Sequence, residues 1–136
     1  MRLCCIAILN RQDMPVYLRT FDTPGAKESD TEYECLAHTS CDVIEERMSK
    51  SSDAYLGLLQ TAGDVAVYGY VSNTGIRIMV MLRVQEPVVR DTAVRELLLI
   101  VHRAYVVRMC NPFSDQENES PRFEAVVGEL ARLHSN

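Results

Sequence analysis

Three side chains that could share a metal ion, His38, Asp42 and Glu45, stand at positions i, i+4 and i+7 of one segment. If this segment is helical, all three lie on one face, and imidazole and carboxylate groups are common zinc ligands. A solvated acidic face gives the same pattern, and the sequence shows no second group of ligands. We therefore interpret these residues as a solvated or partner-binding face and expect no metal ion or cofactor.

Cys110 is the second candidate for chemistry, because a thiol beside a histidine can act as a nucleophile. It lies in the stretch MCNPF, residues 109–113, at the end of a long apolar run. His102 precedes it by eight residues. This is about 12 Å along a helix axis, so a helix that reaches Cys110 excludes a direct hydrogen bond. His134 can approach only through tertiary folding. We interpret the thiol as structural and MCNPF as a helix end, which Pro112 terminates.

The composition is that of an ordinary soluble protein, with 47% hydrophobic and 24% charged residues in a chain of 136. The net charge of -5 argues against a broad phosphate-binding surface, so nucleic acid is not an expected partner. The five cysteines lack C-x-x-C spacing, which is typical of reduced and mostly buried thiols. Two of them, Cys4 and Cys5, are adjacent and should point to opposite faces of a strand. No apolar stretch approaches the ~20 residues of a membrane span, so we expect no direct membrane insertion.

Hydrophobic periodicity predicts the order β-β-α-β-β-β-α-α. Continuous or alternating apolar residues mark the strands, and apolar residues at i, i+3 and i+4 mark the helices. The predicted strands are residues 3–9, 16–20, 54–60, 65–71 and 76–84, and the predicted helices are 31–49, 91–109 and a third that begins at Pro121 after the capping residue Ser120. Short connections make neighbouring strands antiparallel. We expect an α+β fold in which a five-stranded antiparallel sheet carries one helix on one face and two on the other, as a single domain over residues 1–136.

The predicted helix 91–109 is apolar nearly all round. Its main face is a run at helical spacing, made of Val94, Leu97, Leu98, Val101, Ala104, Tyr105 and Met109. Leu99 and Val106 form a second stripe, and Ile100 and Val107 form a third. A helix with this pattern is usually covered on more than one side. The cover is either the sheet with another helix, or the sheet with a partner protein.

Six stretches, read in order, resemble one protein family. They are CIAIL (5–9), HTSCDVIEE (38–46), YLGLL (55–59), VYGYVSNTGI (67–76), RELLLIVHRAYVVRMCNPF (95–113) and SPRFEAVV (120–127). Together they are similar to the sedlin-like small subunits of the TRAPP vesicle-tethering complex, over almost the whole chain. The resemblance implies a longin (SNARE-like) fold, whose order of strands and helices agrees with the one that periodicity predicts.

The function that the resemblance implies is that of a non-enzymatic adaptor. Such subunits support the assembly of a cytosolic complex on ER-to-Golgi and Golgi routes, and that complex promotes nucleotide exchange on Rab GTPases. The implied partners are other TRAPP subunits, with Rab proteins reached indirectly. The family carries an acidic segment on its first helix, which Asp42 matches. We therefore predict partner-binding residues at Asp42, Glu45 and Glu46 and, on the second helix, at Leu99 and Val106.

Two other classes of function stay open at this point. A free-standing longin regulator would be a stable monomer that binds a SNARE or a small GTPase directly. A thiol- or metal-dependent hydrolase would use Cys110 or His38, and would show a low-pKa thiol or a titratable metal.

Overall fold

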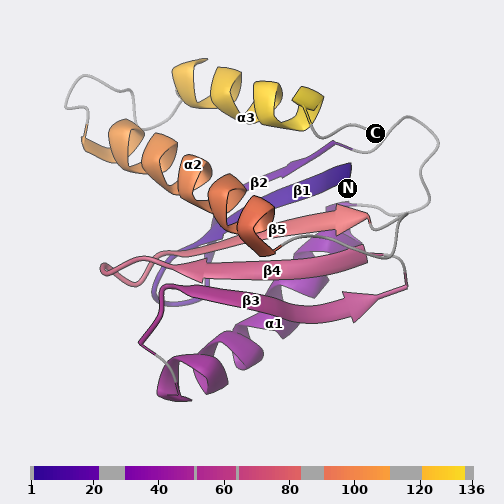
Figure 1. Cartoon of the computed structure of the whole chain (residues 1–136), viewed down its shortest axis with the longest axis vertical. Helices are drawn as coiled ribbons and strands as arrows, with labels where there is room; N and C mark the ends of the chain where they lie inside the picture. Colours follow the sequence, from indigo (N-terminus) through magenta and orange to yellow (C-terminus); the bar gives the residue numbers. More distant parts are fainter. Residues whose placement is uncertain are drawn as a thin grey trace.

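The elements of the chain follow the predicted order (Figure 1). The computed structural model describes residues 2–21, 30–50, 52–63, 65–83, 91–110 and 121–133. The strands are β1 (Arg2–Leu9), β2 (Pro15–Thr20), β3 (Tyr55–Ala62), β4 (Val65–Val71) and β5 (Arg77–Arg83). The helices are α1 (Asp30–Lys50), α2 (Asp91–Cys110) and α3 (Pro121–Leu133).

The five strands form one sheet in the order β2-β1-β5-β4-β3, in which all neighbours are antiparallel. β5 lies at the centre, and its pairing with β1 joins the amino-terminal hairpin to the β3–β4–β5 meander. Figure 1 shows α1 on one face of the sheet and α2 with α3 on the other. The predicted α+β arrangement is confirmed.

The observed bounds differ from the predicted ones mainly at β3. This strand runs past the predicted end at residue 60 to Ala62, because Ala62 pairs directly with Val65 and Gly63 takes a φ of 63° in the tight connection. Val84, predicted as the last residue of the fifth strand, and the predicted cap Ser120 lie outside the described residues.

Irregular register marks both outer strands of the sheet. β2 begins with Pro15, and its pairing with β1 shifts between Ile8 and Leu9. The pairing of β3 with β4 shifts twice between Tyr55 and Gln60. Each shift interrupts the regular ladder of backbone hydrogen bonds and increases the local twist.

The sheet separates two apolar cores, and β5 contributes to both. Met79 and Met81 lie in the core on the α1 side, whereas Ile78 and Val80 lie in the core under α2 and α3. All four side chains are fully buried, as expected for a central strand whose alternate side chains point to covered faces. Burial of this apolar surface, at roughly 25 cal/mol per Å², is the main force that holds the helices to the sheet.

Cys4 and Cys5 correct one prediction from the sequence. Adjacent strand residues were expected to point to opposite faces, but both thiols lie in the core on the α1 side and both are fully buried. The cause is a register shift in the β1–β5 pairing between Leu3 and Cys5. Such a bulge sets two residues of one strand against one of its partner, and so breaks the alternation.

The turn between β1 and β2 is organised by one asparagine. Asn10 Oδ1 accepts hydrogen bonds from the backbone N–H groups of Gln12 and Met14, both at 3.0 Å. Asp13 takes a φ of 61°, in the left-handed region that aspartate tolerates better than most residues. β1 and β2 are thereby joined by a tight turn.

The turn between β4 and β5 lies against the β1–β2 turn at the same end of the sheet. Ser72 N donates to the carbonyl oxygen of Ile76 at 2.9 Å and closes the turn. Gly75 has a φ of 88°, and a Cβ at this position would lie 2.5 Å from Cγ of Arg11. Glycine is therefore needed at position 75 both for its backbone conformation and for the close approach of the neighbouring turn.

Candidate interaction surfaces

The three candidate metal ligands of α1 do not converge. His38 and Asp42 are exposed, whereas Glu45 is bonded to Arg77. In the part of the chain that the structure describes, no group of three or more His, Cys, Asp or Glu side chains is arranged to hold a metal ion. What this side of α1 presents is an acidic protein surface.

Arg77 is the buried charge that organises this side of the molecule. It opens β5, and its side chain is only 6% exposed. Nη1 donates to the carbonyl oxygens of Asn10 (3.2 Å), Arg11 (3.1 Å) and Gly75 (3.4 Å). Nη2 donates to a carboxylate oxygen of Glu45 on α1. One planar guanidinium thus joins both turns to the helix, which a lysine could not do with the same geometry.

Asp13 is the second carboxylate beside this guanidinium. Its Oδ1 lies 3.1 Å from Nε of Arg77. The two atoms form an ion pair, although they are not aligned as a hydrogen bond. The side chains of Asp13 and Glu45 are 37% and 58% exposed, so only the arginine is fully withdrawn from water. An unpaired charge so deep would cost several kcal/mol, which explains why two carboxylates face it.

Cys41 of α1 lies beside the same cluster. Its Sγ donates to the carbonyl oxygen of Ala37 at 3.4 Å. Burial raises the pKa of the Cys41 thiol to about 12, and the negative charge and hydrogen bonding of Asp13 add to the increase, while Arg77 opposes it. The thiol therefore stays protonated at neutral pH, which is the opposite of what a nucleophilic cysteine requires.

The other flank of α1 is bonded to β3 by polar side chains. Gln60 Nε2 donates to the carbonyl oxygen of Leu36 at 2.9 Å and to the hydroxyl of Ser40 at 2.7 Å. Arg47 Nη1 donates to the carbonyl oxygen of Leu56 at 2.6 Å. Together with the Arg77–Glu45 pair, these bonds fix α1 to the sheet on both of its flanks.

The predicted acidic surface consists of Asp42, Glu45 and Glu46, and all three are exposed on α1. Glu46 pairs with Lys50 at 3.0 Å, and this hydrogen bond lowers the pKa of Glu46. Glu45 is occupied by Arg77. No described cation forms an ion pair with Asp42. The role of these residues in partner binding stays a prediction. Of the three carboxylates, Asp42 is the one best placed to pair with a basic side chain of another protein.

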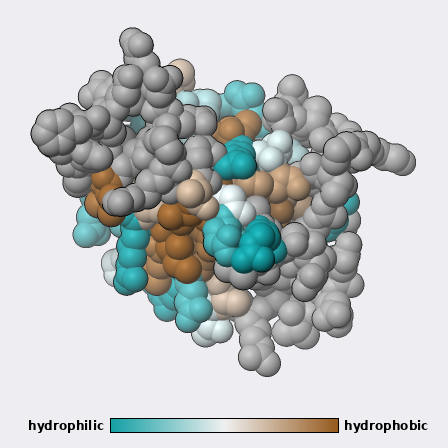
Figure 2. Space-filling model, turned by 90° about the horizontal axis from the view of Figure 1, so that it is seen from above, coloured by the Kyte–Doolittle hydropathy of each residue, from teal (hydrophilic) through white to brown (hydrophobic). Residues whose placement is uncertain are grey.

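α2 buries its predicted main face and leaves apolar side chains on its other sides. The buried residues are Val94, Leu97, Leu98, Val101 and Tyr105, whereas the side chain of Met109 lies outside the described part. The sheet and α3 both pack against α2, so the first of the two predicted covers is present. Leu99 is half-buried, and Val106 and Val107 are 41% and 53% exposed. Figure 2, which views the molecule from above Figure 1, shows an apolar patch bordered by hydrophilic side chains.

A polar contact fixes α2 near its amino-terminal end. Nη2 of Arg95 lies 3.0 Å from both carboxylate oxygens of Asp53, just before β3. The same guanidinium lies over the ring of Tyr55, with Cζ 5.3 Å from the ring centroid. Both partners of the ion pair are about half exposed, so the contact orients the helix more than it stabilises it.

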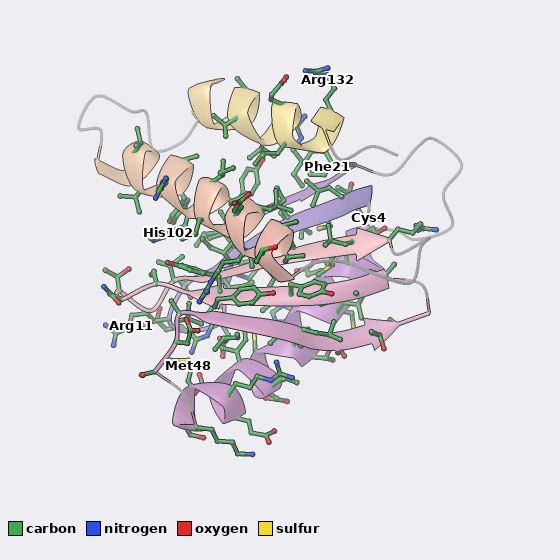
Figure 3. All side chains as sticks on the ribbon, viewed as in Figure 1. Cys4, Arg11, Phe21, Met48, His102 and Arg132 are labelled. Atoms are coloured by element: carbon green, nitrogen blue, oxygen red, sulfur yellow. The ribbon has the colours of Figure 1, made fainter. Side chains whose placement is uncertain are left out.

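His102 continues the line of Arg95 and Leu99 along α2 toward Val106. Its ring centroid lies 5.1 Å from that of Tyr70 on β4, and Figure 3 shows it on the side of α2 that meets the sheet. Burial lowers the pKa of His102, and the positive charge of Arg103 lowers it further. The imidazole is therefore neutral at physiological pH, and the predicted Leu99–Val106 stripe is bordered by an uncharged ring.

The arrangement of α2 removes one of the catalytic alternatives. The helix continues to Cys110, which sets His102 about 12 Å away along the axis and excludes a direct hydrogen bond between them. Residues 111–113, the rest of MCNPF, and His134 lie outside the described residues. The predicted role of Pro112 in ending the helix is therefore untested.

Comparison with known proteins identifies the family. A family model described as Sedlin matches residues 8–133 of the chain. The chain belongs to the sedlin family. A relative from Mus musculus, called trafficking protein particle complex subunit 2-like protein, is 34% identical over 132 residues, which cover 90% of this chain and 92% of the relative.

Relatives with the same name occur in distant organisms. The one from Taeniopygia guttata is 33% identical over 93% of this chain and 94% of its own length. The one from Dictyostelium discoideum is 28% identical over 95% and 96%. The sedlin-family chain is thus similar to these proteins from end to end, and its five-stranded sheet with three helices is the longin arrangement expected of the family.

Two structural residues of this sedlin-family chain were not singled out from the sequence. Arg77 was placed in an alternating strand, where a charged residue is normally assigned to the solvent face. Gln60 was predicted only to lie in a strand, without its bonds to the first helix. The available signal was that Arg77 shares its strand face with Met79 and Met81, an apolar pattern that favours a covered face.

Among the helices that the structure describes, none is long and apolar enough to span a membrane.

Proposed function

We propose that this sedlin-family chain is a non-catalytic adaptor subunit of a TRAPP-type vesicle-tethering complex. The observation that carries the proposal is the end-to-end similarity to proteins called trafficking protein particle complex subunit 2-like, at 34% identity in the mouse relative. The chemistry of the described residues agrees with a binding role. Cys41 is held protonated, and His38, Asp42 and Glu45 do not converge.

In this proposal residues 1–136 act as a single longin domain whose partners are other TRAPP subunits. The chain supports the guanine-nucleotide exchange activity of the complex toward Rab GTPases, without supplying the exchange site. Its place is cytoplasmic and peripheral at ER and Golgi membranes, where the complex holds it.

Two surfaces are proposed to bind partners, and they lie on opposite sides of the sheet. The first is Asp42 with Glu45 and Glu46 on α1, where Asp42 has no cation of its own among the described residues. The second is the stripe of Leu99 and Val106 on α2. Asp42 provides charge for specificity, and the stripe provides apolar area for affinity.

Purification of the tagged protein from its own cells, followed by mass spectrometry, tests the function. Recovery of TRAPP subunits in stoichiometric amounts is expected. A stable monomer that copurifies with a SNARE or a GTPase and with no TRAPP subunit would support the free-standing longin regulator instead.

Asp42→Tyr tests the α1 surface. The side chain is exposed, so we expect a thermal midpoint within about 2 °C of wild type and a loss of binding to purified TRAPP subunits of about tenfold. Glu34→Tyr is the matched control, because Glu34 is another exposed carboxylate of α1. Equal binding by the wild type and the Asp42 variant would remove this surface from the proposal.

A further inference from the structure

The acidic surface of α1 and the buried Arg77 meet at one side chain, Glu45. Asp42 and Glu45 stand three residues apart, so they are neighbours on the same side of the helix. One carboxylate oxygen of Glu45 accepts the hydrogen bond from Nη2 of Arg77, while 58% of the Glu45 side chain stays exposed. Glu45 is therefore anchored from inside the molecule and accessible from outside.

Arg77 itself is out of reach of a partner protein. Its side chain is 6% exposed, and Nη1 is occupied by three backbone carbonyl oxygens of the β1–β2 and β4–β5 turns. Backbone hydrogen bonds close these turns, such as the one from Gly75 N to Ser72 O at 3.0 Å. The guanidinium thus has a fixed position relative to the sheet, and from there it holds Glu45.

The charges beside Arg77 are negative in sum. Asp13 and Glu45 share its single guanidinium, which leaves one negative charge in excess. Asp42 adds a second, because it forms no ion pair with a described cation. This flank of α1 therefore suits a positively charged side chain of another protein.

The two basic residues near the end of α1 are engaged elsewhere. Lys50 pairs with Glu46 at 3.0 Å. Nη1 of Arg47 donates to a backbone carbonyl oxygen of β3 at 2.6 Å, on the opposite flank of the helix. Neither forms an ion pair with Asp42 or Glu45 among the described residues, so these two carboxylates stay available to a partner.

A carboxylate that is fixed before binding is a better acceptor than a mobile one. A mobile glutamate loses rotamer freedom when it binds, whereas one already held in its bound geometry does not. Side chains that bind ligands are commonly held by a supporting layer of residues that the ligand does not touch. Arg77 has the place of such a support, but it also neutralises part of the charge of Glu45. Its two effects on the affinity for a basic partner therefore have opposite signs.

We propose that Arg77 is a positioning residue for partner binding, which holds Glu45 so that Asp42 and Glu45 together accept one lysine or arginine of a partner subunit. Asp42 supplies a carboxylate without a described ion pair, and Glu45 supplies the carboxylate oxygen that Arg77 does not bind. The proposal rests on the proposed function, since it concerns the same surface of α1. It adds that a buried residue of β5, which the partner does not touch, sets the affinity of that surface.

The experiment measures the affinity of the full chain for the TRAPP subunits that copurify with the wild type, each prepared separately. Arg77→Met should weaken binding about tenfold, because Glu45 becomes mobile. If Arg77 only neutralised Glu45, its removal would strengthen the binding of a basic partner, most of all at low salt. The sign of the change therefore separates positioning from neutralisation.

Leu82→Ala is the matched control for stability. Leu82 lies on the same strand as Arg77, but it is fully buried in the core under α2 and α3. Its truncation should cost at least as much stability as Arg77→Met and leave the affinity within about twofold of wild type. All affinities are measured well below the thermal midpoints, so that each variant is folded. An equal loss of affinity in both variants would assign the effect to stability alone and overturn the proposal.

A double-mutant cycle tests whether Arg77 acts through Glu45. In the Glu45→Ala background, Arg77→Met should lower the affinity by less than about twofold, since the side chain that it positions is gone. The same loss in both backgrounds would show that Arg77 acts by another route and would overturn the proposal.

The remaining outcomes separate this inference from the proposed function. Unchanged or stronger binding by Arg77→Met, with a loss in Asp42→Tyr, rejects the inference and keeps the α1 surface. Unchanged binding by Asp42→Tyr rejects the surface and the inference together. If the wild type binds no TRAPP subunit, the proposed function fails as well.

Discussion

The two long helices lie on opposite faces of one sheet, and apolar burial holds both, but polar bonds contribute differently to the two attachments. α1 is tied by directional bonds on both flanks, through Gln60 toward β3 and through the Glu45–Arg77 pair toward the turns. α2 is held by apolar burial between the sheet and α3, and the half-exposed ion pair between Arg95 and Asp53 lies near its amino-terminal end. Directional bonds specify one geometry, because buried polar groups are costly when unpaired. Apolar packing tolerates repacking more readily, so we expect the surface of α1 to be more rigid than that of α2.

The largest expected effect comes from breaking the packing of α2. Leu97→Ala deletes a fully buried side chain and should lower the free energy of unfolding by about 3 kcal/mol, through lost burial and a residual cavity. Urea denaturation measures the change. Leu99→Ala, two residues along the same helix and only half-buried, should cost less than about 1 kcal/mol. Similar losses at both positions would contradict the division of α2 into a buried and a surface face.

The next effect comes from removing the directional attachment of α1. Arg77→Met keeps the apolar part of the side chain but leaves Asp13 and Glu45 without their cation, and should cost about 2 kcal/mol. Hydrogen exchange should speed up in the carboxyl-terminal half of α1 and in both turns, and not in α2. Arg77→Lys should restore little of the lost stability, because an ammonium group cannot form the forked set of hydrogen bonds that the planar guanidinium forms.

Arg132→Met is the control for the Arg77 variant. Arg132 forms an exposed ion pair with Glu129 on α3, and its loss should not change the midpoint measurably. Faster exchange throughout the molecule in Arg77→Met would show that the arginine supports the whole fold and not α1 in particular.

The smallest effect concerns the pH dependence of the α2 side. The pKa of His102 is lowered in the folded state, chiefly by burial, so the unfolded chain binds a proton at a higher pH than the folded one. The stabilising contribution is present above the unfolded pKa of about 6.5 and is lost as the pH falls through the folded pKa. His102→Gln should flatten the fall in stability on acidification below about pH 6.5, as followed by thermal midpoints. If the dependence of the thermal midpoint on pH is the same in the variant and the wild type, a group other than His102 causes the loss of stability.

The arrangement of helices and sheet could be predicted because it depends on periodicity. Runs such as LCCIAIL and the spacing of Tyr33, Ala37 and Ile44 report burial directly. The Arg77 cluster could not be predicted, because it joins two turns and a helix that are far apart in sequence, and its burial depends on how the turns approach. The faces of Cys4 and Cys5 were mispredicted for a related reason. A bulge is set by pairing between strands, which the residues of one strand do not record.

The candidate surfaces were predictable to different degrees. Exposed positions on α1 and α2 follow from helical spacing, so Asp42 and Val106 could be placed at the surface from the sequence. The ion pairs that Glu45 and Glu46 form within the protein could be predicted only in part. The Glu46–Lys50 pair follows from i, i+4 spacing, whereas the partner of Glu45 comes from another strand.

The irregular outer strands have a consequence for contacts with other protein chains. A further strand pairs with a sheet edge through a regular row of backbone hydrogen-bond donors and acceptors. This row is interrupted by the proline at the start of β2 and by the register shifts of β2 and β3. These features disfavour the addition of a strand from another chain through backbone hydrogen bonds alone. Any protein that binds these edges would have to recognise side chains, which differ from one position to the next.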